Sequence, residues 1–157
     1  MAVNPNTTFV ANAVLPASQM NRLPFGVMGN VYRTAGNVAC TVGSVADITG
    51  MTVTFTALAS RTYKATWTAT GFKSTSNGWV AVFLADSTNT VYGAVYNTGF
   101  ITGTEGYWNC SGVTYFSNLA AGSTTLKLRN QTENASATVL ASGTNPCVLM
   151  IEDCGPS

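Results

Sequence analysis

The sequence contains no histidine, and this absence removes several kinds of chemistry. Serine–histidine and cysteine–histidine nucleophilic systems need an imidazole base, and many metal sites need an imidazole ligand. A glycosidase would need only two carboxylates. The available acids are Asp47, Asp86, Glu105, Glu133, Glu152 and Asp153. None of them stands in a pattern specific to catalysis, so we predict no enzymatic activity, no catalytic residues and no cofactor or metal.

Charged residues are also scarce. They make up 8% of the chain, against about 25% in a usual soluble domain. The formal net charge is +1 and no basic stripe is present, so electrostatic binding of nucleic acid is not expected. Threonine, serine and asparagine supply the polarity instead. Hydroxyls and amides lose less free energy on desolvation than charges do, and such a surface therefore suits contact with neighbouring subunits.

Long hydrophobic runs are missing as well. No stretch approaches the ~18 consecutive apolar residues that span a bilayer, so no membrane partner is predicted. Residues 1–6 have no basic region followed by an apolar one, and we expect no signal peptide. Synthesis in the cytoplasm is the expectation.

The chain has four cysteines, Cys40, Cys110, Cys147 and Cys154. No pair has CxxC spacing, which disfavours zinc. An even number allows two disulfides in three connectivities. If the last two cysteines lie on one extended segment they cannot be bridged, because the Cα atoms of a disulfide lie within ~7 Å of each other. Buried free thiols are the favoured interpretation and disulfides the alternative.

Strict alternation of polar and apolar residues recurs along much of the chain. Residues 52–57 and 63–70 change polarity at every step. A period of two places threonine on one face of an extended strand and valine or aromatic residues on the other. The dominant secondary structure is therefore predicted to be β.

Candidate strands cover residues 27–34, 38–42, 45–49, 51–58, 61–72, 79–85, 90–96, 107–116, 123–129, 135–140 and 147–152. We expect the first two to pair with each other. The Asn77-Gly78 step predicts a hairpin, since both residues tolerate positive φ. The continuous apolar run 79–85 is typical of a strand buried on both faces.

Many short strands joined by glycine, asparagine and serine turns indicate a sandwich or barrel. We predict an all-β fold, a two-sheet antiparallel jelly-roll sandwich over residues 27–157. An immunoglobulin-type sandwich is the alternative, but its characteristic spacing of cysteines and tryptophan is missing.

Residues 1–26 differ from the rest of the chain. Pro5, Pro16 and Pro24 each push the preceding residue toward extended geometry. The apolar residues along this segment are Phe9, Val10, Val14, Leu15, Met20, Leu23 and Phe25. We predict an extended arm that attaches the domain to another molecule, with these side chains as its contacts. A strap across its own domain is the alternative.

The last candidate strand is apolar on both faces. Cys147, Leu149 and Ile151 share one side, and Val148 and Met150 share the other. Only one side can meet the sandwich core, so the other needs cover from the arm or from an identical subunit. We predict that Val148 and Met150 form an oligomer interface, with a homotrimer as the expected assembly.

Aromatic rings could also stack on sugars. The candidates are Tyr92, Tyr96, Tyr107, Trp108 and Tyr115. Most of them should pack in the core, where each buries about 150–250 Å². Tyr107 and Trp108 beside Gly106 form the candidate glycan contact.

Three groups of motifs, taken in order, resemble those of virion surface proteins of tailed bacteriophages. The chain begins with FVANAVLPASQMN at 9–21 and LPFGVMG at 23–29, continues with DITGMTVT at 47–54 and RTYK at 61–64, and ends with VLMIEDCGP at 148–156. Related proteins are described as head decoration, head fibre or minor tail proteins. The similarity spans nearly the whole chain, although each motif is short, and Cys154 stands where an apolar residue is more usual.

This resemblance implies a jelly-roll domain similar to tumour-necrosis-factor-like (TNF-like) modules, often trimeric, with an N-terminal segment that attaches it to the particle. The expected function is structural: decoration of the virion surface, with the major capsid protein or another virion protein as partner. The alternative is a minor tail or adhesion protein that binds host surface glycans. The resemblance implies no catalytic residues.

Overall fold

The computed structural model describes residues 23–74, 78–98, 106–133 and 137–157, and these contain strands and turns but no helix. A six-stranded sheet has the order β1-β10-β4-β9-β2, with β7 pairing with β4, and a four-stranded sheet has the order β3-β8-β5-β6. The six-stranded sheet contains β1 (Gly26–Arg33), β2 (Asn37–Ala39), β4 (Arg61–Ser74), β7 (Gly106–Phe116), β9 (Thr138–Leu140) and β10 (Cys147–Pro156). The four-stranded sheet contains β3 (Ala46–Ala57), β5 (Trp79–Asp86), β6 (Val91–Thr98) and β8 (Gly122–Thr132).

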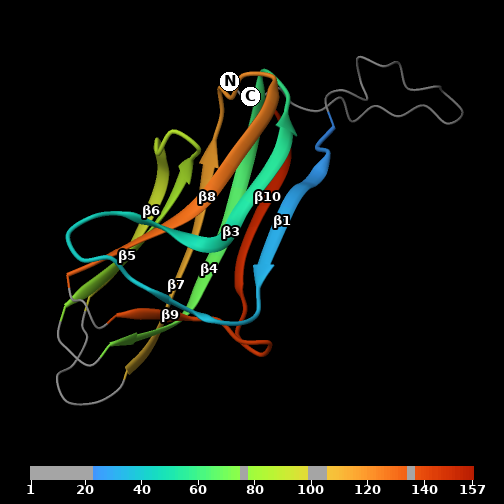
Figure 1. Ribbon diagram of the computed structural model, residues 1–157. Coiled ribbons are helices and arrows are strands. Elements are labelled where there is room, and N and C mark those ends of the chain that lie inside the picture. Colours follow the sequence, from blue (N-terminus) through green and yellow to red (C-terminus); the bar gives the residue numbers. More distant parts are fainter. Residues whose placement is uncertain (1–22, 75–77, 99–105, 134–136) are drawn as a thin grey trace, which may run out of the picture.

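The two sheets pack face to face as a jelly-roll sandwich (Figure 1). All pairs between these strands are antiparallel. The sheets also approach each other at both sides: Arg33 donates to the carbonyl of Thr49 across β1 and β3, and the Thr114 hydroxyl donates to the carbonyl of Tyr92 across β7 and β6. The predicted fold class is therefore confirmed.

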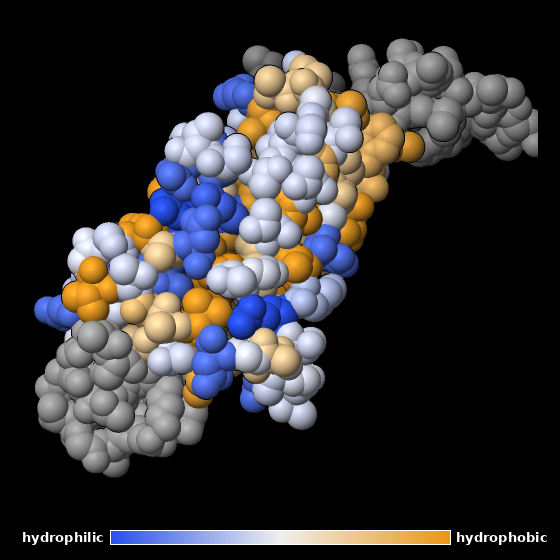
Figure 2. Space-filling model, in the orientation of Figure 1, coloured by the Kyte–Doolittle hydropathy of each residue, from blue (hydrophilic) through white to orange (hydrophobic). Residues whose placement is uncertain are grey.

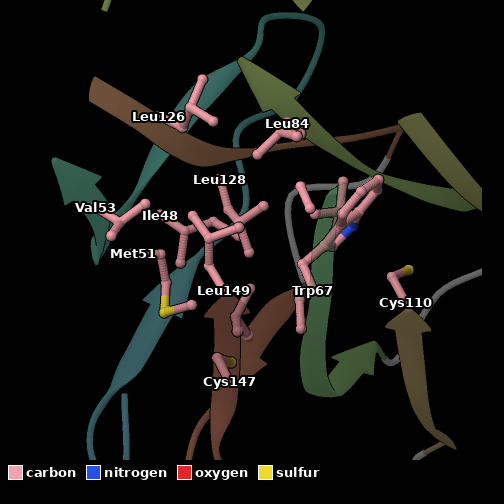
Figure 3. Packing of buried hydrophobic residues seen from close by; sticks show 14 of the residues in the cluster. Ile48, Met51, Val53, Trp67, Leu84, Cys110, Leu126, Leu128, Cys147 and Leu149 are labelled. Carbon is pink, nitrogen blue, oxygen red and sulfur yellow. The ribbon is translucent and has the colours of Figure 1, made fainter. Parts of the chain in front are cut away.

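The hydrophobic core lies between the sheets and follows the alternation of the sequence. On β4 the inward residues Tyr63, Ala65, Trp67 and Ala69 are buried, and the threonines between them face outward. Figure 3 shows Leu128 of the four-stranded sheet close to Leu149 of the six-stranded sheet, with Trp67 beside them.

Two predicted pairings are wrong. β1 pairs with β10 and β2 pairs with β9, although residues 27–34 and 38–42 were expected to pair together. The expected hairpin at Asn77-Gly78 does not form, because β4 and β5 belong to different sheets. In both cases a local turn signal indicates that the chain turns, but it does not decide which strands become neighbours. Burial of apolar area in the sandwich decides that.

β5 and the turn that follows it agree with the prediction from the sequence. Residues 80–85 of β5 are all buried, as the continuous apolar run predicts. Residues 86–89 turn the chain into β6, and Asn89 has a φ of 73°. The expected strands 45–49 and 51–58 are a single strand, β3, with an irregularity between Asp47 and Thr52 where Gly50 has a φ of 80°.

Candidate interaction surface

The outward side of the six-stranded sheet is the candidate site, and we call it the outer face. Since directly opposite residues of paired strands share a face, the register of β1, β10, β4 and β7 places their outward side chains in three rows. These rows are Tyr32, Val148, Thr68 and Ser111; Asn30, Met150, Thr66 and Val113; and Val27, Glu152, Lys64 and Tyr115.

The outer face is rich in exposed apolar side chains. Val27 and Tyr32 are each 54% exposed, Val113 is 55% exposed and Tyr115 is 65% exposed. Val148 and Met150 lie between β1 and β4 and are half-buried. These residues lie on β1, β10 and β7, and the outward side chains of β4 between them are polar. Isolated exposed apolar residues are ordinary on proteins, whereas several on one sheet face favour an interaction surface.

The charges on the outer face neutralise each other. Lys64 Nζ lies 2.6 Å from Glu152 Oε2, and this hydrogen bond raises the pKa of Lys64. The lysine therefore stays protonated throughout the physiological range. A neutral pair of this kind opposes the approach of another molecule less than an isolated charge would.

Over β3 and β8, the outside of the four-stranded sheet is more polar than the outer face. Thr52, Thr54 and Thr56 are exposed there, and Asp47 forms ion pairs with Lys127 and Arg129 at 2.8 and 2.7 Å. Figure 2 views the side on which these strands lie in front and shows mostly weakly polar and hydrophilic surface over them. Of the two sheet exteriors, the outer face is therefore better suited to apolar association than the β3–β8 surface.

The predicted interface residues lie on this surface. Cys147, Leu149 and Ile151 are fully buried, whereas Val148 and Met150 point to the outer face, as the alternation predicts. Sequence reasoning missed Tyr32, Val113 and Tyr115. These lie on strands whose two faces both carry apolar residues, so the pattern did not reveal which face is outward.

Most of the predicted arm contacts, from Phe9 to Met20, lie outside the described residues, and Leu23 and Phe25 lie within them. The carbonyl oxygen of Leu23 accepts a hydrogen bond from Arg61 at 2.7 Å. The Phe25 ring centroid lies 4.7 Å from the guanidinium carbon of Arg61. The end of the predicted arm thus contacts its own domain.

Of the predicted glycan contacts, Trp108 is half-buried and packs against the core. The side chain of Tyr107 lies outside the described part of the chain. Tyr92 packs against the core, whereas Tyr96 is 61% exposed. Tyr96 lies against Phe83 and Trp79, with ring centroids 5.8 and 6.1 Å apart.

All four cysteines are free; three are buried and Cys154 is exposed. Burial raises the pKa of Cys40 to about 12 and that of Cys110 to about 11. For a pKa of about 12, roughly one thiol in ten thousand is ionised at pH 8. We expect a thiol reagent to label Cys154 quickly in the native protein and all four cysteines after denaturation, as counted by mass spectrometry. Rapid native labelling of Cys40 or Cys110 would contradict this burial.

The described residues contain no cluster of three or more potential metal ligands. Within the same ranges no helix has the length and hydrophobicity to cross a bilayer.

Comparison with known proteins identifies the fold. No family model and no curated protein sequence matches the chain. Among solved structures, Eiger TNF from S. frugiperda superposes with a TM-score of 0.57 at 8% identity, covering 84% of this chain and 95% of that one. Murine APRIL at pH 5.0 superposes with a TM-score of 0.53 at 10% identity, covering 82% and 98%. The protein therefore has a TNF-like jelly-roll domain.

Proposed function

We propose that this protein is a structural component of a bacteriophage virion surface, in which jelly-roll domains associate as a trimer through the outer face. Residues 1–26 attach the trimer to the capsid or to another virion protein. The apolar outer face is the observation that carries the proposal of self-association. The virion location rests on the sequence resemblance of the motifs at 9–29 and 148–156. The role is non-enzymatic.

The mechanism requires only burial of apolar surface. Each Å² of apolar area removed from water contributes about 25 cal/mol, and Tyr32, Val113 and Tyr115 offer largely exposed side chains for this purpose. A trimer would also present three arms, so weak contacts of single arms would add up through a high effective concentration. The trimeric state follows the expectation set by the sequence resemblance.

Self-association predicts that a charge in the middle of the outer face lowers the oligomeric state. Met150→Arg places a cation between β1 and β4, where a second copy would have to desolvate it at a cost of several kcal/mol. We expect light scattering at micromolar concentration to report a trimer for the wild type and a monomer for Met150→Arg. Thr56→Arg, on the exposed side of the other sheet, should stay trimeric. A monomeric wild type would disprove the proposed assembly.

Attachment through the arm predicts that deletion of residues 2–22 leaves a folded domain that no longer binds particles. The deletion spares Leu23 and Phe25, which contact Arg61. We expect the shortened protein to unfold at nearly the wild-type temperature and to remain in the supernatant when particles are sedimented. Normal decoration of particles by the shortened protein would contradict attachment through the arm.

Adhesion to host glycans is the second candidate function, favoured by Tyr96. Its ring is 61% exposed and is held against two other aromatic rings. A rigid exposed ring is suited to stacking on the apolar face of a sugar. Retention of the protein on host cell walls, without retention on capsids, would favour this function over decoration.

A further inference from the structure

Arg61, the first residue of β4, forms a buried ion pair with the last strand. Its Nε and one terminal nitrogen donate to the Asp153 carboxylate at distances of 2.6 to 3.1 Å. Arg61 is 4% exposed and Asp153 is 2% exposed. The carboxylate also accepts a hydrogen bond from the backbone N–H of Gly155 at 2.7 Å. The guanidinium is therefore fixed in orientation by β10.

The same guanidinium holds the segment just before β1. The same terminal nitrogen that bonds to Asp153, Nη2, also donates to the Leu23 carbonyl at 2.7 Å, and the guanidinium carbon lies 4.7 Å from the centre of the Phe25 ring. The side chains of Leu23 and Phe25 are 41% and 53% exposed. Because these side chains are only partly buried, polar and cation–π contacts with Arg61 contribute much of what holds this segment.

Stability alone does not explain an arginine here. Apolar residues of similar volume often replace a buried ion pair without loss of stability. A lysine could pair with the Asp153 carboxylate, but a single ammonium lacks the planar fork that serves a carboxylate, a carbonyl and a ring together. The combination of contacts therefore indicates a role in joining segments 23–25 and β10.

We propose that Arg61 is the positioning residue of the attachment arm. It fixes residues 23–25 on the domain, so that force on the arm passes to β10 and β4 without a free hinge at the junction. Ser157, whose N–H donates to the Ser60 carbonyl at 3.0 Å, secures the chain end beside the same residue. This inference rests on the proposed function of residues 1–26 as an attachment segment.

Chymotrypsin cleavage after Phe25 tests the inference on the full-length protein without any particle. A ring held against Arg61 must be released before a protease can bind it, so the cleavage rate follows the local opening equilibrium. We expect Arg61→Lys to raise the rate of cleavage after Phe25 roughly tenfold or more, measured as the appearance of the fragment that begins at Gly26. Cleavage sites within the sandwich should be cut no faster than in the wild type.

Asp47→Asn is the control, since it removes ion pairs with Lys127 and Arg129 on the outside of the other sheet and should leave the rate unchanged. Phe25→Ala provides a second variant that leaves the core intact, and it should speed amide exchange at residues 26–28. Equal cleavage rates for the wild type and Arg61→Lys would overturn the inference, as would equal acceleration by Asp47→Asn. Because no particle is present, this result is independent of whether the arm binds virions.

Discussion

Gly112→Ala is expected to destabilise the domain by about 3 kcal/mol or more, because there is no room for a methyl group at this position. A Cβ atom on Gly112 would lie 2.3 Å from Cζ2 of Trp67 and 2.6 Å from its Cε2. Trp67 is 2% exposed and lies in the middle of the core, so its ring cannot move without displacing its neighbours. Urea unfolding followed by circular dichroism measures the effect.

The effect of Gly112→Ala should be specific to the contact with Trp67. Gly143→Ala serves as the control, since a Cβ there meets no atom within 4 Å, and its unfolding free energy should stay within about 0.5 kcal/mol of the wild type. In a double-mutant cycle, Trp67→Phe should remove part of the penalty of Gly112→Ala. A wild-type stability for Gly112→Ala would show that the ring does not occupy this position.

Arg61→Ala is expected to cost about 3–5 kcal/mol of unfolding free energy, because it leaves the Asp153 carboxylate buried without its cationic partner. The side chains of Arg61 and Asp153 are 5% and 0% exposed, so water cannot replace the lost guanidinium without local opening. Denaturant unfolding at neutral pH measures the loss. Arg61→Met combined with Asp153→Leu should recover part of it, since no buried charge is then left unpaired, while the Gly155 N–H and the Leu23 carbonyl still lose their partners.

The same two strands supply the control for this prediction. Lys64 and Glu152 pair across β4 and β10 at 2.6 Å, but their side chains are 30% and 27% exposed. An ion pair in contact with water contributes about 0–1 kcal/mol, so Lys64→Ala should change the stability of the unassembled domain by less than 1 kcal/mol. Similar losses for Lys64→Ala and Arg61→Ala would mean that burial does not set the strength of these pairs.

The sequence predicts the strands well because alternation is a local property. The threonines of β3 and β4 mark the outward positions, and the run at β5 marks a strand buried on both faces. The sequence also predicts that Val148 and Met150 point away from the core. Cys147, Leu149 and Ile151 form the larger apolar set on this strand, and the larger set faces the core. Each of these features depends on neighbours one or two positions away in the chain.

Strand pairing could not be predicted in the same way. Gly36, which lies between β1 and β2 with a φ of 83°, and the Asn77-Gly78 step are turn signals. Nevertheless β1 pairs with β10 from the far end of the chain, and β4 and β5 lie in different sheets. On β7, Val113 and Tyr115 alternate with Cys110 and Phe116, which are equally apolar, so only packing against Tyr63 and Trp67 decides which face is buried.

By itself, the amino-acid sequence determined that the chain is all-β, that its surface carries little charge, and that imidazole chemistry is excluded. These properties follow from composition and from a period of two, which every strand carries within itself. The tertiary structure alone decided which strands are neighbours, that Tyr32, Val113 and Tyr115 gather with Met150 on one face, and that Arg61 joins Asp153 to Leu23. The reason is physical: residues 38 or 92 positions apart meet only when burial of the whole core outweighs the entropy of closing long loops.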